Sequence, residues 1–197
     1  MKNSITIDNN RDKAMEIVLV AKEIFAKHGY KKSTLEDIAN SLDIVKSALY
    51  HYYKNKEDIF CSVIEFEIDT FFNKLNIDIR KSSSTKGKLL KFSKNKYLYY
   101  KQFLNLYNLT VDDLYENYKN IIKIREGFIR KNIEFVEAIL QADSSLRDRK
   151  EIRDWSRIFI FSVRGIIKNS YQNDRMKNQD REIELFIDIF LKGIKGI

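Results

Sequence analysis

Residues 33–56 read STLEDIANSLDIVKSALYHYYKNK and carry the pattern of two short helices separated by a tight turn. Ser33 and Thr34 are each followed three residues later by an acid, an arrangement in which a hydroxyl and a carboxylate cap the start of a helix. Apolar residues then recur at helical spacing from Leu35 to Leu42. This spacing predicts a first helix with one buried face.

A second helix is predicted from Val45 to about Tyr53, because Asp43 and Ile44 leave room for only a tight connection. Two short helices joined in this way form a helix-turn-helix, whose second helix can enter the major groove of B-DNA. Helical spacing sorts the side chains of the second helix into an inward group, Ala48, Leu49, Tyr52 and Tyr53, and an outward group, Lys46, Ser47, Tyr50 and His51.

The longer run from Ile24 to Phe60 closely resembles the DNA-binding head of the tetracycline-repressor (TetR) family. The resemblance covers residues 11–71, and beyond them only the helical layout is similar. It implies a wholly helical homodimer that binds a DNA operator and changes its affinity when a small effector binds the C-terminal domain. The matching pieces are Phe25, Gly29-Tyr30, Ser33-Thr34, Asp37-Ile38-Ala39, Lys46 and Leu49-Tyr50-His51-Tyr52-Tyr53-Lys54-Asn55-Lys56-Glu57.

Three positions depart from the usual pattern of the family. Asp43 stands where a glycine is common in the turn, and an aspartate tolerates left-handed backbone better than most residues. Val45 replaces the small hydroxyl residue that usually caps the second helix, so we expect that cap to be weakened or moved to Asp43. Ser47-Ala48 replaces a common Gly-Thr pair. These departures affect which operator is recognised rather than whether DNA is bound.

The composition predicts an all-α protein. The chain of 197 residues has no proline and six glycines, so few residues interrupt its long helical periodicities. We expect about nine helices, arranged as an N-terminal three-helix helix-turn-helix head and a C-terminal helical domain for effector binding and dimerisation. The predicted domains are residues 1–54, which bind DNA, and residues 55–197, which bind the ligand and dimerise.

The residues that could carry chemistry are few. Cys61 is the single cysteine, which excludes an internal disulfide framework and fits a reducing compartment. We expect a cytoplasmic protein with no membrane partner, because neither a signal segment nor a membrane-length apolar run is present. His28 and His51 are the two histidines, and no Cys/His cluster or glycine-rich phosphate loop occurs. The sequence therefore predicts no enzyme activity, no metal site and no cofactor.

The net charge of +8 suits a nucleic-acid partner, but its distribution matters more than its sum. No acid lies between Ile44 and Lys56, so a basic surface for phosphate contact is available there. Residues 80–101 hold eight Lys or Arg and no acid. We interpret that stretch as a solvated helix face with a basic loop, while attraction of an acidic ligand or an anionic membrane surface stays an alternative.

The outward face of the second helix carries the candidate DNA contacts. Tyr50, with His51 beside it, is expected to contact the DNA backbone. Ser47 and Ala48 can touch base edges, Ala48 only through its methyl group. The candidate phosphate contacts are Lys46, Lys54, Lys56 and a hydroxyl at Ser33 or Thr34, although both hydroxyls can instead serve only as helix caps.

The resemblance places a group of aromatic residues on the helices that enclose the effector cavity in this family. Taken singly, most of them read as ordinary helical core. Together, tyrosine hydroxyls among apolar residues suit a pocket with a few polar anchors. We expect a mainly apolar or aromatic effector, and an anionic group that the basic residues 80–101 would meet stays an alternative. The candidate pocket residues are Phe71, Tyr97, Tyr100, Phe103, Tyr107, Phe128 and Phe135.

The last two helices, predicted at about residues 150–171 and 180–195, are apolar over more than one face. Such helices need two packing partners. We expect them to pack against their own domain and against a second copy in an isologous four-helix interface, which is also the usual dimer of the family. The candidate interface residues are Trp155, Phe159, Val163, Ile166, Phe186, Ile187, Phe190 and Ile194.

We therefore interpret the sequence as a TetR-type transcriptional repressor, a homodimer on a pseudopalindromic operator that a small effector releases. Two alternatives stay open. A TetR-like body could serve mainly for assembly or partner binding without a small-molecule effector, which a well-filled pocket would favour. An enzyme that modifies a small molecule would need a polar catalytic cluster in the cavity.

Overall fold

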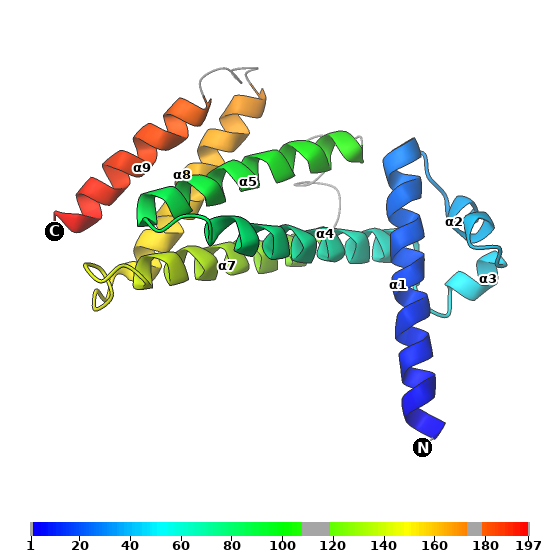
Figure 1. Ribbon diagram of the computed structural model, residues 1–197. Coiled ribbons are helices and arrows are strands. Elements are labelled where there is room, and N and C mark those ends of the chain that lie inside the picture. The colour runs from blue at the N-terminus through cyan, green and yellow to red at the C-terminus, as the bar shows by residue number, and fades with distance from the viewer. Residues whose placement is uncertain (1, 108–118, 173–178, 197) are drawn as a thin grey trace. The chain divides into compact units, whose positions relative to one another are not determined.

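The computed structural model describes residues 2–107, 119–172 and 179–196, and these residues form eight helices and no strand (Figure 1). The predicted all-α class is confirmed, and the helix count is close to the predicted nine. The helices are α1 (Lys2–His28), α2 (Leu35–Ser41), α3 (Lys46–Leu49), α4 (Lys56–Ile79), α5 (Thr85–Leu106), α7 (Lys119–Gln141), α8 (Ile152–Gln172) and α9 (Gln179–Lys195).

One helix of the helix-turn-helix differs in length from its prediction. α3 ends at Leu49, four residues before the predicted end at Tyr53. The reason is a change in hydrogen bonding: the N–H groups of His51 and Tyr52 bond to carbonyls only three residues earlier, so the chain continues as tight turns.

The chain divides into two compact units, and α4, α5 and α7 supply residues to both. The head unit consists of Met1–Thr70 and Lys101–Arg125, and the body unit of Phe71–Tyr100 and Glu126–Ile197. The predicted functional boundary after residue 54 stays a prediction, because compactness groups the first part of α4 and the end of α5 with the helix-turn-helix.

The head unit is built around an aromatic core. Phe60 of α4 stacks on Tyr30 with ring centroids 4.1 Å apart, and it meets Phe25 of α1 edge-on at 5.4 Å. Tyr107, just after α5, packs against Phe60 at 5.7 Å and is fully buried. Gly29 follows the end of α1 with a φ of 77°, the left-handed conformation that favours glycine at a helix C-cap. These contacts fix the helices on which α2 and α3 rest.

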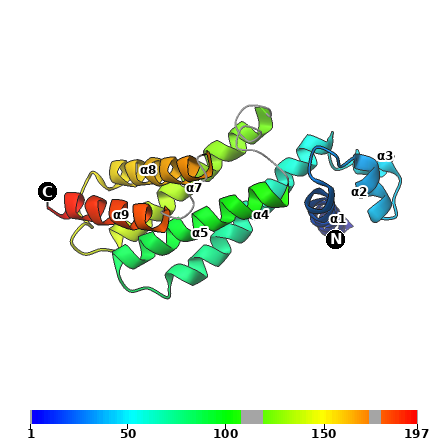
Figure 2. The ribbon, with the colours of Figure 1, turned by 90° about the horizontal axis from the view of Figure 1, so that it is seen from above.

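The body unit has its own core, contributed by α4, α5, α7, α8 and α9. α8 and α9 lie side by side in both views (Figures 1 and 2). Phe159 of α8 is fully buried and packs against Phe92 of α5 and Phe190 of α9, with ring centroids 6.3 and 5.2 Å apart. One side of each of these helices is therefore already occupied within the chain.

Candidate nucleic-acid interface

The start of α2 is held by a capping box at Thr34. The Thr34 Oγ1 accepts a hydrogen bond from the Asp37 N–H at 3.1 Å, and the Thr34 N–H donates to the Asp37 carboxylate at 2.8 Å. Hydrogen bonds from the Thr34 side chain and backbone lower the pKa of Asp37. The predicted cap is confirmed at Thr34, whose side chain is also exposed.

Ser33 differs from its prediction as a phosphate contact. Its side chain is 2% exposed, and its hydroxyl donates to the Gly29 carbonyl at 2.8 Å. The hydroxyl also lies 3.3 Å from the Ile24 carbonyl. Because this group is buried and committed to the end of α1, it stabilises the connection between α1 and α2 and cannot reach DNA.

The turn between α2 and α3 is made by the residue that departs from the family pattern. Asp43 has a φ of 52°, the single positive φ of a non-glycine residue in the described part of the chain. The backbone of the turn is therefore retained without glycine, as predicted. Val45 occupies the N-cap of α3 and forms no side-chain hydrogen bond there, so the expected weakening of this cap is also found.

α3 presents the predicted outward face. Tyr50 is 53% exposed, and Lys46, Ser47 and His51 are exposed with it. Leu49 is fully buried and anchors the opposite face, so its burial fixes the direction in which the outward side chains point. The structure places the remaining residues of the predicted inward group, Ala48, Tyr52 and Tyr53, at intermediate exposure.

Two lysines that were both predicted as phosphate contacts lie in different environments. Lys54 is exposed. The Lys56 ammonium donates to the carbonyls of Ser33 at 2.7 Å and Tyr30 at 2.9 Å, and it lies 4.5 Å from the centre of the Tyr30 ring. Burial lowers the pKa of Lys56. Lys56 is therefore a structural donor to the α1–α2 connection, and its prediction as a DNA contact is corrected.

Comparison with known proteins identifies this head. Residues 17–63, which span α2, α3 and parts of α1 and α4, match the family described as bacterial regulatory proteins, tetR family. The HTH-type transcriptional regulator QacR of Staphylococcus aureus is 25% identical over 196 residues, covering 94% of this chain and 98% of the relative. Residues 17–63 therefore form a TetR-family head.

Two further comparisons give one relative by sequence and one by structure. The fatty acid metabolism regulator protein of Bacillus subtilis is 34% identical over 79 residues, which cover 40% of this chain and 41% of that relative. A crystal structure of the transcriptional regulator FadR from Bacillus subtilis in complex with stearoyl-CoA covers 91% of this chain and 98% of its own, with a TM-score of 0.65 and 19% identity. The structural similarity shows a shared fold.

The structure does not bring all the predicted effector residues together. Phe103 and Tyr107 belong to the head unit and pack against each other with ring centroids 4.9 Å apart. The Tyr107 hydroxyl donates to the Glu67 carboxylate at 3.0 Å. Both residues are therefore part of the aromatic core of the head. The five that share the body unit are Phe71, Tyr97, Tyr100, Phe128 and Phe135.

Those five residues lie on or against one core. Phe128 of α7 is 5.9 Å from Phe71 of α4, and Phe135 of α7 is 5.8 Å from Phe92 of α5, between ring centroids. Tyr97 and Tyr100 are partly buried against the same core. A lysine that was not singled out from the sequence, Lys96, also reaches into this group. The signal in the sequence was its helical spacing from Tyr100 on α5.

The predicted dimer residues differ in their burial. Six of them belong to the core of the body unit and have little surface left for a second copy to cover: Trp155, Phe159, Val163, Ile187, Phe190 and Ile194. Ile166 and Phe186 are partly buried against that core, and the predicted interface stays a prediction. Helical periodicity identified the two apolar helices. It did not distinguish the side that packs in the core of the body unit from the side that is exposed.

The exposed apolar side of the same helices was missed. On α8, Ile158 and Phe161 are 56% and 49% exposed, and on α9, Leu185 and Ile189 are 59% and 62% exposed. Each pair is spaced three or four residues apart and so lies on one face of its helix. We name these four residues the α8–α9 apolar face.

Other chemistry finds little support in the described residues. No group of three or more His, Cys, Asp or Glu in that part of the chain could hold a metal ion. No helix there combines the length and the apolar character needed to cross a membrane. Cys61 is half-buried, and its surroundings raise the pKa of the thiol to about 12, chiefly through burial and then through nearby carboxylates. A thiol of this kind stays protonated at neutral pH and is a poor nucleophile.

Proposed function

We propose that this chain is a TetR-type transcriptional repressor, which binds a palindromic DNA operator as a homodimer and is released by a small, largely apolar effector. The observation that supports DNA binding most directly is the geometry of α3. Lys46 and Ser47 of α3 are exposed together with Tyr50 and His51 of the turn that follows it, and the buried Leu49 anchors the opposite side. A helix held in this way can enter the major groove.

Each exposed residue receives a role from its chemistry. Ser47 and the methyl group of Ala48 read base edges, and Tyr50 and His51 contact the DNA backbone. Lys46 and Lys54 hold phosphates, and the Thr34 hydroxyl joins them by exchanging its hydrogen bond to the Asp37 carboxylate, 2.8 Å in this structure, for one to a phosphate oxygen. Lys46 lies 3.4 Å from Glu36, an exposed pair that a phosphate can replace at little cost. Ser33 and Lys56 position the connection that carries α2.

The α8–α9 apolar face supports the homodimer. Four large apolar side chains exposed on two adjacent helices form a surface that an identical copy can cover, which gives an isologous four-helix interface. A palindromic operator mirrors this two-fold symmetry, and its half-sites lie about one helical turn apart. Pairing thus sets the spacing of the two recognition helices.

Release by an effector is supported by the fact that α5 supplies residues to both units. α5 contributes residues 85–100 to the body core and residues 101–106 to the head unit. Tyr107 after α5 accepts a backbone hydrogen bond from the Tyr30 N–H at 3.2 Å, and its hydroxyl donates to Glu67. A ligand that rearranges the body part of α5 would therefore act on the head through the same helix. Two of the relatives are a regulator of fatty acid metabolism and a regulator bound to stearoyl-CoA, which favours an apolar effector.

The DNA-binding proposal is tested by selecting bound duplexes from a randomised pool and measuring affinity by fluorescence anisotropy at fixed salt. The wild-type chain is expected to enrich an inverted repeat. The Lys46→Ala/Tyr50→Ala variant removes two contacts from each half-site and is expected to bind this repeat about 100-fold more weakly or worse. Both residues are exposed, so the variant is expected to keep its fold, which circular dichroism verifies.

A matched control removes charge elsewhere. Lys150→Ala/Lys192→Ala changes two exposed lysines of the body unit and is expected to retain affinity within about threefold. If the folded Lys46→Ala/Tyr50→Ala variant binds as tightly as the control, α3 is not the recognition helix and the proposed function is rejected.

A further inference from the structure

Lys96 is a basic residue of α5 that points its ammonium group into the body unit. The Lys96 Nζ donates to the Asn132 Oδ1 of α7 at 2.8 Å. It lies 4.8 Å from the centre of the Phe128 ring and 5.7 Å from that of Phe92. Asn132 is fully buried, and its amide nitrogen donates to the Phe128 carbonyl one turn earlier. The amide is thus locked with its oxygen toward the lysine.

No carboxylate among the described residues pairs with the Lys96 ammonium. In the part of the chain that the structure describes, Lys96 forms no ion pair, and Asn132 is its one hydrogen-bond partner. An ammonium has three N–H donors, so two remain for another acceptor. Arg164 of α8 adds a second positive charge nearby, and burial together with this charge lowers the pKa of Lys96 to about 7. A bound anion would supply the missing negative charge.

A second polar group lies one turn away on the same helix. Ser93 is fully buried, and its hydroxyl has no hydrogen-bond partner among the described residues. Residues 93 and 96 are three apart and therefore share a face of α5. A buried hydroxyl without a partner is costly, and an oxygen-rich head group can satisfy it. Lysine and serine together present donors for such a head group.

The surroundings of this polar group are apolar. Phe92 and Phe128 flank the ammonium, and Phe71 and Phe135 continue the same aromatic core. Simple inorganic anions gain nothing from such walls, whereas a molecule with an apolar body does.

We propose that Lys96, positioned by Asn132, binds the carboxylate or phosphate head group of an otherwise apolar molecule within the body unit. This inference rests on the proposed function in that it names the chemical class of the effector. It concerns binding alone, so it can be tested without DNA.

The experiment compares four probes by isothermal titration calorimetry: dodecanoate, dodecyl phosphate, 1-dodecanol and inorganic phosphate. The wild-type chain is expected to bind at least one of the two anionic amphiphiles about tenfold or more tightly than 1-dodecanol, and inorganic phosphate weakly. Which of the two binds better identifies the head group. Lys96→Met keeps the apolar stem and removes the charge, and it is expected to abolish the preference over 1-dodecanol.

Lys94→Met is the matched control, because Lys94 is an exposed lysine on the same helix, 3.9 Å from Asp180. It is expected to keep the preference. The inference is overturned if neither amphiphile binds the wild type, if folded Lys96→Met keeps the preference, or if inorganic phosphate binds as tightly as the amphiphiles. Loss of operator binding with retained probe binding would instead reject the proposed function alone.

A second measurement needs no variant. An anion stabilises the charged form of Lys96, so the site is expected to take up a proton on binding at pH 8. The affinity for dodecanoate should then fall by about tenfold as the pH rises from 6.5 to 9, whereas that for 1-dodecanol should not fall. Asn132, the hydrogen-bond partner of Lys96, does not titrate. Equal pH profiles for the two probes would contradict the assignment.

Discussion

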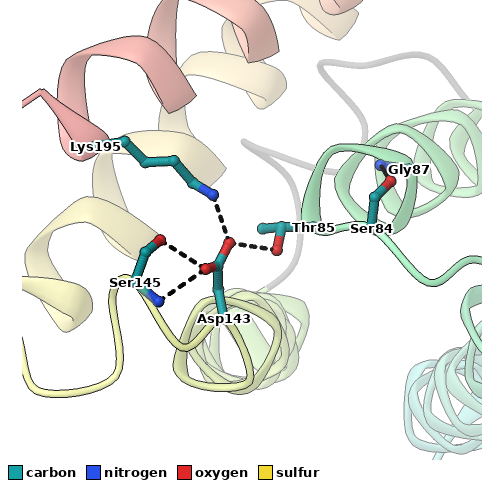
Figure 3. A network of polar contacts seen from close by, with 6 residues as sticks. All are labelled: Ser84, Thr85, Gly87, Asp143, Ser145 and Lys195. Carbon is teal, nitrogen blue, oxygen red and sulfur yellow. Dashed lines mark hydrogen bonds and ion pairs between the residues drawn. The ribbon is translucent and has the colours of Figure 1, made fainter.

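Asp143, after the end of α7, joins three segments of the body unit through one carboxylate (Figure 3). It accepts hydrogen bonds from the Lys195 ammonium, the Thr85 hydroxyl and the Ser145 hydroxyl, each at 2.7 Å. These donors hold the pKa of Asp143 well below its usual range, with the Lys195 contribution the largest. A single short side chain thereby ties the start of α5 to the end of α9.

Asp143→Asn is expected to lower the free energy of unfolding by about 2 kcal/mol at pH 7, because charge-assisted hydrogen bonds are lost. Since the folded pKa of Asp143 is depressed, its contribution is present above the unfolded pKa of about 4 and is lost as the pH falls toward the folded value. The stability gap between wild type and variant should therefore narrow from pH 7 to pH 3 in urea unfolding.

The control for this variant is Asp148→Asn, which changes an exposed aspartate of the same connection. It is expected to alter stability by less than about 0.5 kcal/mol at either pH. A gap for Asp143→Asn that is equally large at pH 7 and pH 3 would show that the carboxylate is not held by its charge.

At the scale of elements, the connection between α1 and α2 depends on a residue from α4. The Lys56 ammonium donates to the carbonyls of Tyr30 and Ser33, and the Ser33 hydroxyl returns to the end of α1. Because α3 is only four residues long, it gains little from its own helical hydrogen bonds. Its position therefore depends on this connection and on the burial of Leu49.

Lys54 and Lys56 offer a matched pair of variants. Lys56→Met is expected to lower the free energy of unfolding by about 1–2 kcal/mol, because two backbone carbonyls lose a charged donor. Lys54→Met is expected to leave stability within about 0.5 kcal/mol, but to weaken operator binding and lower the slope of log affinity against log salt by about 1 per protomer. Urea unfolding and salt-dependent anisotropy separate the two effects. The roles are misassigned if Lys56→Met is as stable as Lys54→Met.

At the scale of the whole molecule, the α8–α9 apolar face is the surface that we propose for the dimer. Ile158, Phe161, Leu185 and Ile189 are all about half exposed or more in the single chain. The core residues beside them, such as Phe159, are already buried. Dimerisation can therefore bury the α8–α9 apolar face without disturbing the core of the body unit.

Phe161→Glu/Leu185→Glu places charges on the α8–α9 apolar face and is expected to convert a dimer to a monomer, because an isologous interface would bury each charge twice. Light scattering coupled to size-exclusion chromatography measures the mass, and affinity for the inverted repeat should fall with dimerisation. Leu98→Glu changes an exposed apolar residue of α5 and is expected to leave the dimer intact. An unchanged mass for the double variant would place the interface elsewhere.

Local sequence patterns predicted a large part of the helix-turn-helix. The capping box at Thr34, the left-handed Asp43 and the outward face of α3 all depend on residues within a few positions of one another. The residues predicted less well depend on distant partners. Ser33 and Lys56 have the residue types of phosphate ligands, but contacts with the end of α1 and with the α1–α2 connection occupy them.

The sequence by itself determined the helical class, the head and the existence of two-sided apolar helices near the C-terminus, because capping and helical periodicity act over one or two turns. Only the tertiary structure decided which side of α8 and α9 is buried, and which basic residue of α5 enters the body unit. A periodic apolar set does not say which neighbour covers each face, and a lysine in a basic stretch reads as solvated. Packing between elements distant in the chain decides both, as the contacts of Phe159 and Lys96 show.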